Sequence, residues 1–207
     1  MADWSFGTTQ LLTTIGMIAT VSFAVAGLRT FGKWKKEKIE ERRIEVALDA
    51  LTLAYESKHI FDAIRRSLSY DIEYKEMPVK EGESENDRSQ RGSFWVVGSR
   101  VRQNRDFFDR AWKLQPRVMA MFGEEVEKTF AKLHSARATI QVASNTLTWE
   151  MPLHESNPSQ EDFELRRQFR TDLWGHSGND RVQADLDEFR AGIVKLCRPV
   201  VDRQFRE

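Results

Sequence analysis

The sequence predicts an all-α protein in which one N-terminal transmembrane helix continues into a helical stalk and a cytoplasmic helical bundle. The first observation is the uncharged segment Trp4–Leu28, which a dense cluster of Lys and Arg follows. The second is that apolar residues recur at helical spacing through most of the remaining chain. The third is that the sequence has no sustained two-residue alternation and no Asn-Gly or Asp-Gly hairpin signal.

The uncharged segment is long enough to cross a bilayer. Its 25 residues would span about 37 Å as a helix, against a hydrocarbon core of about 30 Å. Trp4 and Trp34 flank the segment, about 45 Å apart in a continuous helix, and indole rings favour the two membrane interfaces. We therefore expect residues 1–33 to form an N-terminal tail and a transmembrane helix surrounded by the lipid bilayer.

A cleaved secretory signal is the alternative for this segment, because Ala24-Val25-Ala26 resembles a small-residue cleavage site. A signal peptide begins with Lys or Arg, however, whereas this chain begins Met-Ala-Asp. The sequence therefore favours an anchor. Because short cationic flanks stay in the cytoplasm, we expect the N-terminus outside and the chain from Arg29 onward inside.

Small residues line one face of the expected membrane helix. Their spacings of 4, 3, 4, 4 and 3 keep them on one stripe: Thr9, Thr13, Gly16, Thr20, Ala24 and Gly27. Small residues let two helix backbones approach closely in lipid, and Thr hydroxyls can bond across such an interface. This face is a candidate contact for another transmembrane helix, from a second copy or a partner protein. The plain alternative is that Gly, Ala and Thr are common in membrane helices.

The segment Arg29–Arg43 holds seven cations and three anions, a net charge of +4. Such a segment is attracted to anionic headgroups by about 1 kcal/mol per close cation, and it also serves as a stop-transfer signal. The candidate headgroup contacts are Arg29, Lys33, Lys35, Lys36 and Lys38. The whole chain has a formal net charge of zero, so we expect no nucleic acid among its partners.

Three further segments follow the anchor. Residues 34–70 lack Pro and Gly and are expected to form a basic juxtamembrane stalk and the first bundle helix. Its expected apolar positions are Ile44, Leu48, Leu51, Tyr55 and Ile64, with Ala47 and Ala54 beside them. Residues 71–93 are polar and charged and contain Gly and Pro, which predicts a flexible loop. Residues 94–207 are expected to complete the helical bundle.

Four helices are expected within this last segment. The first covers about Phe94–Leu114, ends before Pro116 and buries Val97, Val101, Phe108 and Trp112. The second begins after Gly123 and runs to about Thr148. Its stripe has a regular helical spacing: Val126, Phe130, Leu133, Ala136, Ile140, Ala143 and Leu147.

The third helix of this segment starts at a capping box of Ser159 and Asp162 and stops at Gly175. Its expected buried side chains are Leu165, Phe169 and Leu173. The fourth runs from near Asp180 to Pro199 with a heptad-like, coiled-coil stripe: Val182, Leu186, Phe189, Ile193 and Leu196.

The sequence carries no phosphate-binding Gly loop, no His-Glu-x-x-His and no Gly-x-Ser-x-Gly. Glu56-x-x-His59 is half of a di-iron motif, and a surface histidine is the simpler interpretation. His154, Glu155, Asp162 and His176 could bind a metal if their loops met, although loop histidines are usually solvated. We therefore assign no catalytic, cofactor or metal residue and expect a protein that is not an enzyme.

The single cysteine, Cys197, excludes an intramolecular disulfide framework and suits a reducing cytoplasm. Neighbouring Lys195 and Arg198 could lower its pKa, but a buried cysteine acting as a small hydrophobe is favoured. Two arginine clusters could form a phosphate or RNA surface: Arg100, Arg102 and Arg105, and Arg166, Arg167 and Arg170. Because acidic residues accompany both clusters, solvated helix faces with i,i+4 ion pairs are the favoured interpretation.

Short stretches spread over most of the chain resemble a group of uncharacterised bacterial single-pass membrane proteins. Besides the N-terminal anchor they are Leu53-Ala-Tyr-Glu56, Phe61-Asp-Ala-Ile-Arg65, Asn104-Arg-Asp-Phe-Phe108, Met121-Phe-Gly123 and Cys197-Arg-Pro199. The resemblance implies a setting in a bacterial inner membrane, and the group has no established activity.

These patterns predict a membrane-tethered interaction, scaffold or accessory protein that presents a cytoplasmic helical bundle to a membrane complex. The alternative is a membrane-anchored ligand or stress sensor whose signal passes through the stalk. A sensor would need a pocket between helices, for which His134, Arg137 and Asn104 are candidate lining residues. A metal-dependent enzyme is a third and weaker alternative, and no cofactor is expected.

Overall fold

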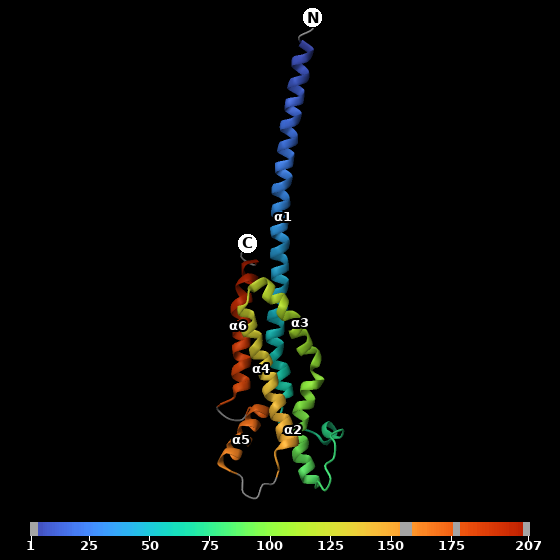
Figure 1. The fold of residues 1–207 in the computed structure, drawn as a ribbon, viewed down its shortest axis with the longest axis vertical. Helices are drawn as coiled ribbons and strands as arrows, with labels where there is room; N and C mark the ends of the chain where they lie inside the picture. The colour runs from blue at the N-terminus through green and yellow to red at the C-terminus, as the bar shows by residue number, and fades with distance from the viewer. Residues whose placement is uncertain (1–3, 154–158, 176–178, 205–207) are drawn as a thin grey trace. The chain divides into compact units, whose positions relative to one another are not determined.

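The computed structural model describes residues 4–153, 159–175 and 179–204, with backbone alone for residues 4–6, 8, 9 and 204. These residues form helices and contain no strand, which confirms the all-α prediction (Figure 1). The elements are α1 (Trp4–Ile64), η1 (Asp71–Tyr74), α2 (Glu85–Gln103), α3 (Arg105–Phe122), α4 (Glu125–Asn145), η2 (Thr146–Glu150), α5 (Gln160–Trp174) and α6 (Arg181–Gln204). The chain divides into two units, residues 1–45 and residues 46–207.

The first unit consists of the N-terminal part of α1. By length and composition, this helix could cross a membrane. Its most apolar 18-residue window has a mean hydropathy of 2.0, and none of the residues in that window is buried. The large apolar side chains from Leu11 to Leu28 are 44 to 79% exposed. Nothing within this unit therefore covers the apolar surface of α1.

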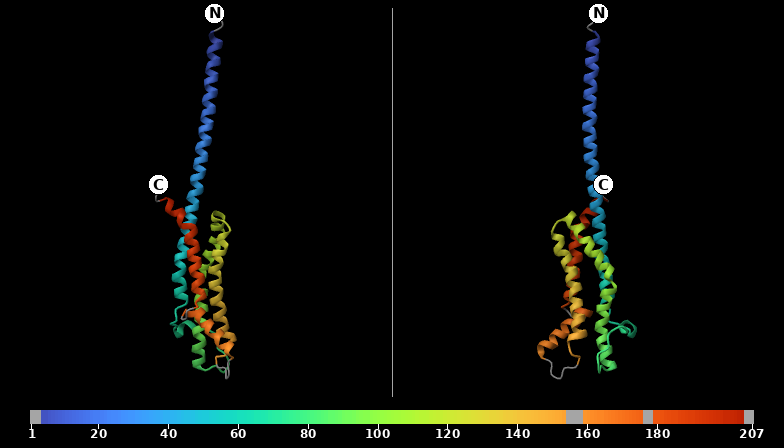
Figure 2. Two further views of the ribbon diagram at one scale, coloured as in Figure 1. Left: turned by 90° about the vertical axis from the view of Figure 1, so that its left-hand side faces the viewer. Right: turned by 45° about the vertical axis from the view of Figure 1, so that its right-hand side comes forward.

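Helix α4 lies at the centre of the second unit and packs against α2, α3, α5 and α6 (Figures 1 and 2). Glu125 and Glu127 stand in its first turn, where acidic side chains favour the positive end of the helix dipole. The predicted stripe is confirmed, because every one of its members is buried: Val126, Phe130, Leu133, Ala136, Ile140, Ala143 and Leu147.

The C-terminal part of α1, from Val46 to Ile64, also contributes to the core of this unit. The expected stripe is only partly correct, because Leu48 and Tyr55 are 47% and 52% exposed. The buried face instead runs along small residues, Ala47, Ala50 and Ala54, beside larger apolar side chains. Alanine allows closer helix approach than Leu or Tyr, which explains why the buried face is rotated toward these positions.

The helix expected over about Phe94–Leu114 is two helices with different limits. Helix α2 begins at Glu85, where the Ser84 side chain accepts a hydrogen bond from the backbone N–H of Asp87. It ends at Asn104, whose side-chain amide donates to the carbonyl of Arg100 at 2.9 Å. An asparagine that bonds its own preceding turn competes with the helical ladder, which accounts for the break.

Helix α3 continues through Pro116 to Phe122, so the predicted end before this proline was wrong. Pro116 is exposed, and water can therefore reach the carbonyl group that the missing N–H leaves free. Pro199 is likewise exposed inside α6, which continues to Gln204, so the predicted end at this proline was also wrong. Trp112 was also expected in the core, but it is 68% exposed and contacts the ring of His134.

The segment predicted as a flexible polar loop, residues 71–93, is fastened to the rest of the second unit. The Tyr74 ring lies against Gly92, where an added Cβ would come within 2.6 Å of it. Arg100 donates from Nε and from Nη2 to the Glu73 carboxylate, each at 3.0 Å, and Arg91 donates to the side chain of Glu83. Composition indicated a loop, but these ion pairs depend on partners brought together by the fold.

The limits of α5 agree with the sequence. Ser159 and Asp162 form the predicted capping box, and Gly175 ends the helix in the left-handed conformation with φ of 73°. Phe169 and Leu173 are buried as expected, whereas Leu165 is 45% exposed. In α6, Val182, Leu186, Phe189 and Ile193 are buried and Leu196 packs at the edge of the core.

The crossing of α2 and α4 depends on Gly98. A Cβ there would lie 2.4 Å from the Ser144 hydroxyl oxygen, which donates to the carbonyl of Phe94 at 2.9 Å. We expect Gly98→Ala to lower the free energy of unfolding by about 1–3 kcal/mol, because the hydroxyl or the helix must shift. Urea unfolding followed by circular dichroism in mild detergent measures this.

Two controls separate the steric effect from helix propensity. Gly32→Ala adds the same methyl group to α1 where no atom lies within 4 Å, so it should not destabilise the protein. Combining Gly98→Ala with Ser144→Gly restores the space and should recover most of the lost stability. A stable Gly98→Ala variant would mean that the two helices do not meet this closely.

Candidate functional site

The membrane-packing residues predicted from sequence lie on α1, on one exposed face. A Cβ added at Gly16 or Gly27 would meet no atom within 4 Å, so nothing within the first unit covers these glycines. Thr13, Thr20 and Ala24 are exposed as well. Thr9 also falls in α1, but its side chain lies outside the described part of the structure.

The hydroxyl groups of this segment bond mainly to their own helix. Thr20 donates to the carbonyl of Gly16 at 2.8 Å, and Thr14 donates to Gln10 at 2.9 Å. Ser22 and Thr30 make the same bond to the residue four positions earlier. Because the Thr20 hydroxyl proton is already used, the stripe offers close backbone approach rather than a hydrogen-bond donor at this position.

The predicted headgroup contacts, Arg29, Lys33, Lys35, Lys36 and Lys38, are all exposed on α1. Lys38 pairs with Glu41 at 2.6 Å, and Lys33 approaches Glu37 at 3.9 Å. Arg29, Lys33 and Lys36 share one helix face through their spacings of four and three. This face concentrates positive charge directly after the apolar part of α1.

The residues considered for metal chemistry have other surroundings. Arg110 donates to the Glu56 carboxylate, while His59 is exposed. His154, Glu155 and His176 lie outside the described residues, and Cys197 is buried in the core. Among the described residues, no three His, Cys, Asp or Glu side chains form a group that could hold a metal ion.

Two of the three candidate pocket residues, His134 and Arg137, lie one turn apart on α4, where both contact aromatic rings of α3. His134 bonds the side chain of Gln115 at 3.0 Å and lies edge-on to Trp112. Burial, and then the charge of Arg137, hold the pKa of His134 below its usual value. Arg137 itself stacks over the ring of Phe108 at 4.5 Å, and Asn104 occupies the break between α2 and α3.

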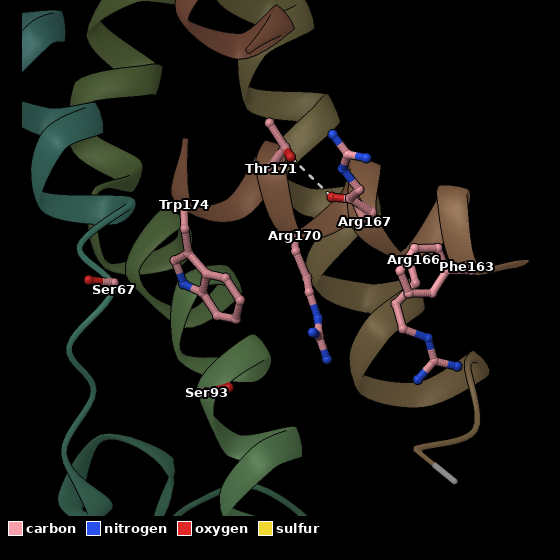
Figure 3. Close-up of a pocket in the computed structure, with 8 residues that line it drawn as sticks. All are labelled: Ser67, Ser93, Phe163, Arg166, Arg167, Arg170, Thr171 and Trp174. Atoms are coloured by element: carbon pink, nitrogen blue, oxygen red, sulfur yellow. Dashed lines mark hydrogen bonds between the residues drawn. The ribbon is translucent and has the colours of Figure 1, made fainter. Parts of the chain in front are cut away.

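A different hollow, which we call the α5 pocket, lies between α5 and the facing parts of the second unit (Figure 3). Its volume is about 520 Å³. Helix α5 lines it with Phe163, Arg166, Arg167, Arg170, Thr171 and Trp174. Ser67, which follows α1, and Ser93 of α2 complete the lining. The first and last of these residues, Ser67 and Trp174, are far apart in the sequence, so only folding assembles the pocket.

Within the described residues, the arginines of this pocket do not form the ion pairs expected from sequence. The carboxylate of Asp162 is used in the capping box with Ser159, and Glu164 accepts a hydrogen bond from Gln160. Arg166 donates to the carbonyl of Pro152 at 2.8 Å, and Arg170 lies over the Phe94 ring at 5.9 Å. For the other cluster, the expected pairing holds between Arg105 and Asp109 at 3.3 Å.

The pocket was not predicted from the sequence, although the sequence carries a signal for it. Phe163, Arg166, Arg170 and Trp174 follow one another at spacings of 3, 4 and 4, which places them on one face of α5. Two arginines flanked by aromatic residues on one helix face differ from a face that carries only solvated charges.

Comparison of the chain with protein-family models, with curated proteins and with solved structures finds no match.

Proposed function

We propose that this protein is a membrane-tethered interaction, scaffold or accessory protein without enzymatic activity. In this proposal α1 crosses the inner membrane once and the helical second unit faces a membrane complex in the cytoplasm. The observation that carries it is the apolar part of α1, whose large side chains are at least 44% exposed from Leu11 to Leu28. Exposing this apolar surface to water is unfavourable in free energy, whereas burying it in the hydrocarbon core of a bilayer is favourable.

The cations after the apolar segment support the proposed orientation. Arg29, Lys33 and Lys36 lie on one exposed face, and Lys/Arg-rich flanks stay on the cytoplasmic side of a membrane helix. The same face is suited to anionic headgroups of the inner leaflet. The N-terminus is accordingly outside, and α2 to α6 are in the cytoplasm.

The small-residue face supports a second membrane helix as partner. Gly16, Ala24 and Gly27 leave a shallow surface on α1 that another helix backbone can approach closely. A photocrosslinker at Ala24 should capture this neighbour. The same group at Ser22, about 160° away on the helix, is the matched control. Equal crosslinking from both positions would count against a defined contact face.

Membrane insertion is tested by placing charge in the apolar segment. We expect the double substitution of Ile18→Arg and Val21→Arg to move the protein from the carbonate-resistant membrane fraction to the soluble or degraded fraction. Each arginine near the centre of a membrane helix costs about 2.5–3.5 kcal/mol of insertion free energy. Ile18→Leu with Val21→Leu is the control and should remain in the membrane.

A C-terminal reporter tests the orientation separately. Green fluorescent protein should fluoresce and alkaline phosphatase should stay inactive at this end of the wild-type chain. The opposite pair of results would overturn the assignment of the C-terminal unit to the cytoplasm.

A membrane-anchored ligand sensor or effector is the second candidate function. The α5 pocket favours it, because its volume of about 520 Å³ is within the usual range for small-molecule sites. A sensor and a scaffold differ in whether occupation of this pocket changes partner binding. Crosslinking from Ala24 with and without a pocket ligand separates the two.

A further inference from the structure

We propose that the α5 pocket binds a small organic anion with an apolar body, whose carboxylate or phosphate lies on Arg170 and Arg166. The apolar body would lie against Trp174, the aromatic ring one turn beyond Arg170 on α5. This proposal goes beyond membrane tethering and does not depend on it. It rests on the arrangement of side chains on α5, on their charge and on the size of the pocket.

The pocket combines cations with a fixed aromatic wall. In Figure 3 the guanidinium groups of Arg166 and Arg170 extend to the same side of α5, whereas that of Arg167 points the other way. The Trp174 ring packs on Phe94 with ring centres 5.5 Å apart, which holds the indole in place. A planar or aliphatic ligand body can therefore contact a surface that is already ordered.

The positive charge in this pocket has no matching carboxylate among the described residues. Arg166 and Arg170 are four positions apart on α5, and like charges at this spacing disfavour a helix. The nearby carboxylates of Asp162 and Glu164 are engaged by Ser159 and Gln160. A bound anion would relieve this repulsion, and a guanidinium group can grip a carboxylate or phosphate through two parallel hydrogen bonds.

The hydroxyl groups of Ser93 and Thr171 already donate their protons within the protein, so the arginines are the donors for the anion. Ser93 donates its hydroxyl proton to the carbonyl of Gln90 at 2.7 Å, and Thr171 donates to Arg167 at 3.0 Å. The Ser93 hydroxyl oxygen can still accept a hydrogen bond from a polar group on the ligand body. A ligand that matches these groups has an anionic head and a hydrogen-bond donor near its apolar part.

A small ligand fits these observations better than a polymer. A nucleic-acid surface needs an extended row of cations, and the chain as a whole has a formal net charge of zero. The pocket instead groups its cations between two aromatic side chains in a hollow of about 520 Å³. That volume holds a molecule with roughly one or two rings.

The test uses the full chain in nanodiscs of zwitterionic phosphatidylcholine and three probes. Naphthalene carboxylate should bind saturably in isothermal titration calorimetry, and its neutral carboxamide should bind at least about tenfold more weakly. Inorganic phosphate should compete with the carboxylate, because both occupy the arginines. Equal affinity for carboxylate and carboxamide, or no competition by phosphate, would overturn the proposal.

Variants locate the binding. Arg170→Gln and Arg166→Gln should each weaken naphthalene carboxylate about tenfold without moving the unfolding midpoint. Arg105→Gln removes an equal charge from the exposed face of α3 and should leave the affinity unchanged. Trp174→Leu removes the ring against which the apolar body lies and should weaken binding. Phe163→Ala removes an exposed ring about 16 Å away along α5, so it should fold normally and leave the affinity unchanged.

Three further results would contradict the proposal. The first is a failure of the wild-type protein to bind naphthalene carboxylate at millimolar concentration. The second is an equal loss of affinity in Arg105→Gln, which would indicate general charge attraction. The third is binding of heparin or anionic vesicles that depends on Arg166 and Arg170 when naphthalene carboxylate does not bind, which would assign these arginines to a macromolecular surface.

Discussion

Replacing Arg91 with leucine is expected to lower the free energy of unfolding by about 3–5 kcal/mol. The Arg91 and Glu83 side chains are 2% and 5% exposed, and the guanidinium Nε donates to the Glu83 carboxylate at 2.6 Å. Arg91 also donates to the carbonyl of Pro78 at 3.0 Å and lies 4.9 Å from the Trp149 ring centre. The substitution would leave a buried carboxylate and a carbonyl without this partner.

The measurement is urea unfolding of the full chain in mild detergent, followed by the helical circular dichroism signal. Arg105→Leu is the matched control, because it breaks an exposed ion pair with Asp109 and should cost less than about 1 kcal/mol. Adding Glu83→Met to Arg91→Leu removes the buried charge and should restore much of the stability. Equal effects of Arg91→Leu and Arg105→Leu would mean that the Arg91 pair is solvated.

The same ion pair should make stability depend on pH. The hydrogen bond from Arg91 lowers the pKa of Glu83 below its usual value of 4.5, and it prevails over burial, which acts in the opposite direction. This contribution is therefore fully present above pH about 4.5 and is lost as pH falls through the lower folded-state pKa. Glu83→Gln should be less stable at neutral pH and should show a shallower loss in acid.

The predictable part of the fold was local. The stripe of α4 from Val126 to Leu147 was correct because one helix face meets several neighbours and must be apolar along its whole length. The capping box of Ser159 and the stop at Gly175 were correct because both depend on a few adjacent residues. Where periodicity and helix ends agree, the sequence alone locates the helix.

The parts that sequence could not supply depend on distant partners. Glu83 and Arg91 resemble a solvated charge run in the sequence, but in the fold the Arg91 guanidinium lies on the ring of Trp149, far along the chain. Leu48 and Tyr55 fit a helical period as well as Ala47 and Ala54 do, and packing decides which side is buried. Arg170 and Ser67 meet in one pocket through the fold alone, although the order of aromatic and arginine residues on α5 was visible.

Phe130→Ala tests whether α4 is as central to stability as its contacts indicate. The Phe130 side chain is 0% exposed, and its ring meets that of Phe189 in α6 edge-to-face with centres 5.5 Å apart. Removing the ring leaves a cavity between α4 and α6 that rigid helices close only in part. We expect the free energy of unfolding to fall by about 3–5 kcal/mol.

Phe130→Leu keeps most of the side-chain volume and should lower the free energy of unfolding by less than about 1.5 kcal/mol. The difference between the two variants therefore measures the effect of the cavity. Phe163→Ala removes the same ring from an exposed position of α5 and should change the unfolding free energy by less than about 0.5 kcal/mol. Binding of naphthalene carboxylate gives an independent readout of folding, since it should be preserved in Phe163→Ala and in folded Phe130→Leu. If Phe130→Ala were as stable as Phe163→Ala, the α4–α6 contact could not be the main source of cohesion in the second unit.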